Sequence, residues 1–175
     1  YVKNGGAVLS TTNDKYIYIS GKYLPPFFEH KYRIVWSRVE TVKKMNQIKH
    51  RAVKELLKNY KIKSGLEIHY DGDLPARSGM GSSSVFVVGL MNLLNNFKGK
   101  KKRKKILEQR SMYFEQKILK EVVGSQDQIA TAYGGFNKII FKSGGGFSVN
   151  PISIKKKTLN KLNINLWLEI GKAHV

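Results

Sequence analysis

One glycine- and serine-rich segment of the sequence carries residue types that suit phosphate binding. It covers residues 73–84 and leads directly into an apolar stretch, residues 85–94, that is typical of a buried helix. Gly79 and Gly81 lack a Cβ, so their backbone can turn sharply and approach a ligand closely. Three serines at the expected helix start, residues 82–84, can cap free N–H groups, and a helix N-terminus is suited to bind an anion. A hydroxyl at this place can also bind Mg²⁺.

These residues alone leave two interpretations of the segment open. It lacks the Gly-Lys-Ser/Thr ending of a P-loop, so it is not that kind of phosphate site. It is either a different phosphate-binding loop or a capped, buried helix whose glycines serve only tight packing.

A glutamate lies on the apolar side of a second expected helix, residues 103–123. The positions three and four away from Glu115 are mostly apolar, and include Ile118 and Leu119. Burying a carboxylate without a partner is costly. Glu115 therefore either reaches water at the edge of the helix or faces inward near the phosphate segment, where it could bind Mg²⁺.

An aspartate follows this helix in a Gly-Ser-Gln-Asp-Gln sequence. Asp127 lies twelve residues after Glu115. Aspartate commonly caps helices, so a structural role is one interpretation. The other is a carboxylate that orients or deprotonates an acceptor hydroxyl, which is the main protein group that phosphoryl transfer needs besides a metal and correct positioning.

The elements that must position these residues follow from the periodicity of the sequence. Alternating or β-branched segments predict strands at residues 7–12, 16–20, 32–39, 65–70, 136–141 and 147–154. Helical spacing predicts helices at residues 50–60, 85–94 and 103–123, with a short helix within residues 124–133. The order of these elements predicts an α+β fold rather than a repeating βαβ sheet, because strands come first, then a helix, a strand, several helices and two final strands.

Composition excludes several classes of protein. The 175 residues fit one domain or part of a larger one, and 41% are hydrophobic, which excludes a mainly disordered chain. With no cysteine, a disulfide scaffold, a zinc finger and a thiol nucleophile are also excluded. No apolar run of membrane-spanning length is present, and because the first residues lack an apolar stretch, we expect no signal peptide.

The net charge of +20 first suggests a nucleic-acid partner. The basic residues are, however, 26 lysines and only 6 arginines, and nucleic-acid recognition relies strongly on arginine. A solvated lysine-rich surface is therefore the favoured interpretation, and the dense run at residues 98–105 is expected to be a connector between two helices.

The segment at residues 75–84 closely resembles the second motif of the GHMP kinases, which include galactokinase, homoserine kinase, mevalonate kinase and phosphomevalonate kinase. In that superfamily the loop wraps the phosphates of ATP. The resemblance implies that the ATP-binding residues are Pro75, Ala76, Arg77, Ser78, Gly79, Met80, Gly81, Ser82, Ser83 and Ser84. It further implies Ser83 and Glu115 as ligands of Mg²⁺, and Asp127 as the base.

Other segments are similar to one branch of the superfamily, the D-glycero-D-manno-heptose 7-phosphate kinases. They are residues 5–12, 15–19, 23–28, 66–79, 124–130 and 134–137. The resemblance implies a GHMP kinase N-terminal domain over residues 1–154, with helices packed on one face of a mixed sheet. It fades over the tail, residues 155–175. The first and third motifs of the superfamily are missing, so we expect a fragment that need not be active alone.

The resemblance implies an ATP-dependent sugar kinase that phosphorylates the anomeric hydroxyl of D-glycero-D-manno-heptose 7-phosphate to the 1,7-bisphosphate, for surface polysaccharide. Alternatives are a kinase for another sugar such as fucose, an inactive remnant, and, less favoured, a basic nucleic-acid-binding module. The expected partners are ATP, Mg²⁺ and a phosphorylated sugar, without nucleic acid or membrane, in the cytoplasm. Lys15, Arg33, Arg38 and Arg77 are candidates for holding the sugar's own phosphate, and the sequence does not choose among them.

Overall fold

The chain folds into two β-sheets and a layer of helices. The computed structural model describes residues 3–75, 79–100 and 103–166. The strands are β1 (Gly6–Thr11), β2 (Ile17–Leu24), β3 (Tyr32–Val35), β4 (Val39–Val42), β5 (Gly65–Gly72), β6 (Phe136–Phe141) and β7 (Phe147–Pro151). The helices are a 3₁₀ turn (Met45–Gln47), α1 (Arg51–Asn59), α2 (Ser82–Phe97), α3 (Lys104–Tyr113), a π-helical turn (Phe114–Ile118), α4 (Gln126–Tyr133) and α5 (Lys156–Asn165). The predicted α+β class is confirmed.

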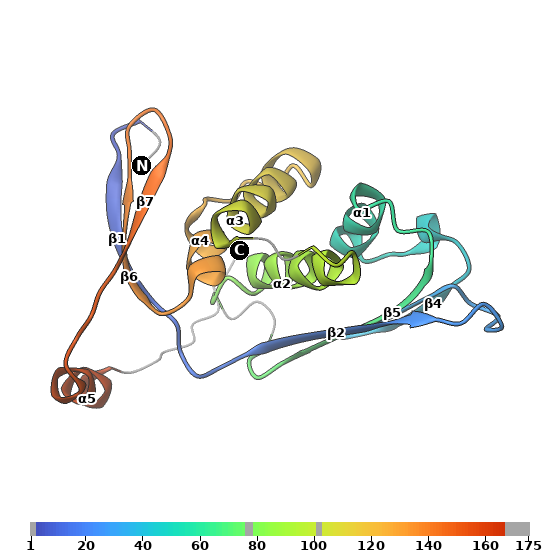
Figure 1. Ribbon diagram of the computed structural model, residues 1–175, viewed down its shortest axis with the longest axis horizontal. Coiled ribbons are helices and arrows are strands. Elements are labelled where there is room, and N and C mark those ends of the chain that lie inside the picture. Colours follow the sequence, from blue (N-terminus) through green and yellow to red (C-terminus); the bar gives the residue numbers. More distant parts are fainter. Residues whose placement is uncertain (1–2, 76–78, 101–102, 167–175) are drawn as a thin grey trace.

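The larger sheet has the strand order β2-β5-β3-β4 and is mixed, because β3 and β5 run parallel while the other pairs are antiparallel. Helices α1, α2 and α3 lie on the same side of this sheet (Figure 1). The buried residues Leu66 and Ile68 of β5 pack there in one core with Leu56 of α1 and Leu90 of α2. The alternation along β5 therefore sends apolar side chains to the helices and polar ones to the opposite face.

The smaller sheet has the order β1-β6-β7, all antiparallel, and stands beside α4 (Figure 1). Its core is formed by Ile139 and Phe141 of β6 with Ile129 of α4. This contact ties α4 to the small sheet, while α4 also packs against α2 and α3. Helix α4 is thus held between the two parts of the fold.

Helix α2 sits closely on the large sheet because glycines remove side chains at the contact. A Cβ on Gly89 would lie 2.8 Å from Ile19 Cδ1, and one on Gly21 of β2 would lie 3.0 Å from Leu93 Cδ2. Such a close approach leaves α2 buried along most of its length, which explains its nearly continuous apolar sequence.

Two predicted elements differ from the structure. The strand expected over residues 32–39 is a hairpin, β3 and β4, because the chain bends at Trp36–Arg38, where Trp36 N donates to the Arg38 carbonyl over 2.9 Å. The helix expected over residues 103–123 ends at Ile118 after changing to a π-helical turn. Lys120 then takes a left-handed backbone conformation with φ +54°, which cannot continue the helix.

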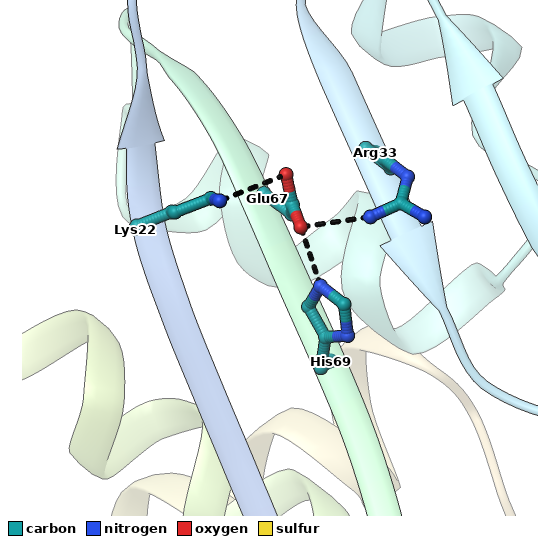
Figure 2. A network of polar contacts seen from close by, with 4 residues as sticks. All are labelled: Lys22, Arg33, Glu67 and His69. Carbon is teal, nitrogen blue, oxygen red and sulfur yellow. Dashed lines mark hydrogen bonds and ion pairs between the residues drawn. The ribbon is translucent and has the colours of Figure 1, made fainter.

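The polar face of the large sheet carries an ionic cluster drawn from three neighbouring strands (Figure 2). Glu67 of β5 lies opposite Lys22 of β2 and Arg33 of β3 in the register of the sheet. Its carboxylate is 2.8 Å from Arg33 Nη1, 3.6 Å from Lys22 Nζ and 2.5 Å from His69 Nε2. The hydrogen bond from His69, assisted by the two cations, holds the pKa of Glu67 below its ordinary value. The cluster stabilises the pairing of these strands.

The C-terminal part of the described chain forms α5, which no sequence pattern predicted. None of its residues is buried. None of the helices in the described part of the chain combines the length and the apolar character that crossing a bilayer requires.

Glu108 of α3 gives a testable pH dependence of stability. Its side chain is 0% exposed, and neither carboxylate oxygen has a hydrogen-bond partner within the described residues. Burial raises the pKa of Glu108 to about 7, from an ordinary value of 4.5, with Lys105 opposing the shift. The folded chain therefore keeps a proton that the unfolded chain releases, and stability should fall as the pH rises from 4.5 to about 7.

Glu108→Gln should remove this dependence, because a neutral amide does not titrate. The free energy of unfolding would be measured in urea at pH 5 and pH 8. Glu29→Gln, at an exposed acid, controls for the loss of one negative charge. An unchanged pH dependence in Glu108→Gln would contradict the prediction.

Candidate functional site

At the start of helix α2, the N-cap residue provides no side-chain hydrogen bond to the backbone N–H groups of the first turn. Gly81 occupies the N-cap position in a left-handed conformation with φ +67°, which favours glycine, and it makes no side-chain capping bond. Its carbonyl accepts the first helical hydrogen bond, from Val85 N, over 3.0 Å. The serines were expected to cap this end, but Ser84 is directed elsewhere. The first turn is therefore suited to receive an external anion.

Ser84 lies in a buried polar cluster with Glu115 and Gln128. The exposed fractions of the three side chains are 4%, 0% and 0%. Ser84 Oγ donates to Glu115 Oε1 over 3.0 Å, and Gln128 Nε2 donates to Ser84 Oγ over 3.0 Å. Gln128 Nε2 also donates to Glu115 Oε2. Glu115 thus faces inward, and the alternative of an edge position in water is wrong.

Burial raises the pKa of Glu115, although the hydrogen bonds from Gln128 and Ser84 oppose the shift. Within the described part of the chain, no ammonium or guanidinium group pairs with this carboxylate, and no group of three or more His, Cys, Asp or Glu side chains could hold a metal. A cation here would have to use one carboxylate together with hydroxyl, amide or phosphate oxygens. That is the usual way in which proteins bind Mg²⁺ beside a nucleotide.

The structure joins Glu115 to a different serine from the one that the resemblance indicated. Ser83 is exposed and lines an adjacent hollow, whereas the adjacent Ser84 is buried and contacts Glu115. Consecutive residues of a helix point about 100° apart, so one turn of α2 directs Ser83 outward and Ser84 inward.

Asp127 lies in the first turn of α4, next to the start of α2. Helix α4 begins at Gln126 with Ser125 at the N-cap, so Asp127 is not the cap. A Cβ on Gly81 would lie 2.9 Å from Asp127 Cγ and Oδ2. The exposed Asp127 carboxylate therefore lies against the backbone of Gly81, at the same helix terminus that suits an anion.

Two hollows flank the start of α2, and Ser82 lines both of them. One has a volume of about 380 Å³ and an aromatic wall. The members of this wall are Trp36, His50, Tyr70 and Phe86. Their ring centroids are 4.8 Å apart for Trp36–His50, 4.9 Å for His50–Phe86 and 5.5 Å for Tyr70–Phe86. Burial lowers the pKa of His50, so its ring stays neutral at neutral pH.

A buried glutamate holds this aromatic wall together. Glu40 Oε1 accepts hydrogen bonds from Trp36 Nε1 over 3.1 Å and from His50 N over 3.0 Å. Its other oxygen accepts from Lys49 N. Sequence reasoning missed the wall because its residues come from four separate segments, and only their contacts bring them together.

The second hollow has a volume of about 350 Å³ and is lined by both polar and apolar side chains. Its polar lining residues are Thr11, Thr12, Asn13, Lys15, Tyr16, Ser82 and Thr131. Thr131 stands one turn after Asp127 on α4 and donates its hydroxyl to the Asp127 carbonyl over 2.7 Å. The second hollow thus combines hydroxyl, amide and ammonium groups with apolar side chains, and it borders α4 one turn from Asp127.

The remaining predicted residues fall into three groups. Pro75 and Met80 line the second hollow, and Gly79 lies exposed in the loop with φ +77°. Ala76, Arg77 and Ser78 lie outside the described residues. Among the cations proposed for a sugar phosphate, Lys15 lines the second hollow, Arg33 pairs with Glu67 and Arg38 is exposed beyond β3.

Comparisons with known proteins identify a family and a shared fold. Residues 46–135 match the family described as GHMP kinases N terminal domain. The chain is 32% identical over 95 residues to the D-glycero-alpha-D-manno-heptose 7-phosphate kinase of Campylobacter jejuni. This aligned region covers 54% of the chain and 28% of that protein.

Two solved structures share the fold. A D-glycero-D-manno-heptose 1-phosphate kinase from Bacteroides thetaiotaomicron superposes with a TM-score of 0.78 at 24% identity, over 90% of the chain and 55% of that protein. A protein described as a sugar kinase from Campylobacter jejuni superposes with a TM-score of 0.69 at 22% identity, over 93% and 55%. The chain thus spans about half the length of these structures.

The two loop glycines allow a matched test of the contact with Asp127. Both have left-handed backbones, so Gly79→Ala and Gly81→Ala should each lose about 1–2 kcal/mol of stability in urea unfolding. A Cβ on Gly79 meets nothing within 4 Å, whereas one on Gly81 displaces the Asp127 carboxylate. The carboxyl ¹³C resonance of Asp127 should therefore shift only in Gly81→Ala. Equal shifts in both variants would refute the contact.

Proposed function

The chain belongs to the GHMP kinases, and on that basis we propose that it provides the nucleotide-binding part of an ATP-dependent sugar kinase. The proposed acceptor is D-glycero-D-manno-heptose 7-phosphate, phosphorylated on its anomeric hydroxyl to the 1,7-bisphosphate. We assign the domain to residues 1–154 and leave residues 155–175 to the remainder. The observation that carries the proposal is the uncapped start of α2, which has a buried carboxylate, an exposed carboxylate and an aromatic hollow around it.

The nucleotide would bind across the start of α2. Its phosphates suit the free N–H groups of the first turn, with Gly79, Gly81 and Ser82 as the cradle. Its base suits the aromatic hollow, because stacking on aromatic rings stabilises a base and Ser82 connects the hollow with the helix start. The His50 ring, whose pKa is lowered by burial, adds a further flat face on which the base can stack.

Magnesium fits the Glu115 side of the site. A buried carboxylate that has only hydroxyl and amide donors as partners favours a nearby cation. Glu115 would hold it together with a serine hydroxyl of α2, Ser83 by the resemblance or Ser84 by its contact with Glu115. When bound, Mg²⁺ would neutralise charge on the β- and γ-phosphates.

Asp127 would act on the acceptor. Its carboxylate would take the proton of the acceptor hydroxyl as that oxygen bonds to the γ-phosphorus and the bond to the ADP oxygen breaks. The hydroxyl and amide groups of the second hollow, one turn of α4 from Asp127, support an acceptor with hydroxyl groups, and Lys15 is its one lining cation within the described residues. The heptose itself rests on the named relatives, since the hollow alone would also suit another sugar.

The test of this function uses the purified complete gene product with ATP, Mg²⁺ and a panel of sugars and sugar phosphates, and measures ADP release. We expect turnover with D-glycero-D-manno-heptose 7-phosphate and a product phosphorylated at O1. Asp127→Asn should lower kcat by about 10²–10⁴-fold, the usual effect of removing a positioned base. Asp71→Asn, at an exposed acid of β5, should leave kcat unchanged.

Turnover only with another sugar, such as fucose, would overturn the acceptor assignment, and no turnover with ATP binding would indicate an inactive remnant. An Asp127→Asn variant within about tenfold of the parent would exclude the base role.

Trp36→Ala tests the nucleotide hollow separately. Loss of one base–aromatic contact, worth about 1–3 kcal/mol, should raise the KM for ATP at least about fivefold with little change in kcat. Phe27→Ala, at an aromatic that is 78% exposed in the turn after β2, is the matched control and should not change either constant. An unchanged KM for ATP in Trp36→Ala would show that the adenine base of ATP does not bind in this hollow.

A further inference from the structure

The carboxylate of Glu115 accepts a hydrogen bond from Gln128, a residue to which the proposed function assigns no role. Gln128 lies on α4, adjacent to Asp127, and its side chain is 0% exposed. Its amide nitrogen carries two protons. One is donated to Ser84 Oγ and the other to Glu115 Oε2, while Ser84 donates to Glu115 Oε1. The three side chains form a closed triangle in which both carboxylate oxygens have a fixed donor.

The same amide leaves one oxygen free. Within the described residues, Gln128 Oε1 is buried and has no hydrogen-bond partner. An unsatisfied buried carbonyl is costly, so such a group usually has a partner that the protein alone does not supply. The cluster therefore combines one carboxylate, one hydroxyl and one free amide oxygen, which are the ligand types of a hard cation such as Mg²⁺.

From this geometry we propose that Gln128 is a positioning residue that fixes the orientation of the Glu115 carboxylate for a divalent cation. The inference rests on the proposed function, because it deepens the metal side of the same site. Without Gln128, Ser84 alone would hold one oxygen and the carboxylate could rotate. Groups that orient a metal ligand in this way are typically worth 10–100-fold in metal affinity.

The test compares two substitutions of Gln128 with a control amide. Gln128→Met keeps most of the side-chain volume and removes both donors, and Gln128→Ala also removes the volume. Asn95→Ala is the control: Asn95 is a buried amide of α2, 3% exposed, whose Nδ2 also has no partner within the described residues. It lies near Lys98 and Arg110, away from the start of the helix.

Two readouts separate positioning from mere stability. The first is the Mg²⁺ concentration that gives half of the maximal thermal shift in saturating ADP, which needs no turnover. The second is the Mg²⁺ concentration for half-maximal ADP release by the complete gene product. Both should rise by about 10–100-fold in Gln128→Met and Gln128→Ala, and saturating Mg²⁺ should restore most of kcat. Asn95→Ala should lower the melting temperature without moving either concentration.

An unchanged Mg²⁺ dependence in Gln128→Met, or an equal rise in Asn95→Ala, would overturn the inference. Failure of the proposed function has a different signature, because the parent protein would then release no ADP with any acceptor. The thermal-shift titration would still decide the role of Gln128 in that case. If Gln128→Ala does not fold, the Mg²⁺ dependence of Gln128→Met alone tests the inference.

Discussion

The burial of one carboxylate constrains the arrangement around the candidate site. Glu115 is fully buried, and a carboxylate in that position is tolerated only if hydrogen bonds replace the water that it loses. Its donors come from two other helices, Ser84 of α2 and Gln128 of α4, and each bond to a charged group is worth about 1.5–3 kcal/mol. The π-helical turn that carries Glu115 widens the helix at this point, as such turns often do at functional sites. The three helices are thereby fixed relative to one another at the start of α2.

The sheet fixes the other side of the same helix start. Gly89 allows α2 to lie directly on β2, and the loop that precedes α2 is tied to that strand at its beginning. There Tyr16 N donates to Asp73 Oδ2 over 2.8 Å, and Asp73 N donates to the Tyr16 carbonyl over 3.0 Å. The described ends of the loop are therefore both held, one at Asp73 and the other at the first turn of α2. Such a rigid scaffold is what binding an anion by N–H groups requires.

The sequence predicted the class of fold, six of the seven strands and the main helices, because apolar periodicity reports which faces are buried. It placed Glu115 on the apolar side of its helix for the same reason, and left open whether the carboxylate reaches water or faces inward. It could not predict that residues 32–39 bend into a hairpin, since Trp36 is held there by a hydrogen bond to Glu40. Nor could it find Gln128 or the aromatic wall around His50, because the wall draws on four separate segments and a single glutamine carries no local sign of a distant partner. The roles of Ser83 and Asp127 remain predictions.

Helix α4 connects the metal side of the proposed site with the acceptor side. Asp127 and Gln128 are consecutive, so their side chains point about 100° apart around the helix. One contacts the backbone of Gly81 at the surface, and the other reaches Glu115 in the interior. Any rotation of α4 would move both groups together, whereas the packing of Ile129 against β6 opposes such a rotation. The short helix thus ties the distance between the buried Glu115 carboxylate and the exposed Asp127 carboxylate to the packing of a separate sheet. In the proposed reaction, this packing would hold the two groups in the geometry that an in-line transfer needs.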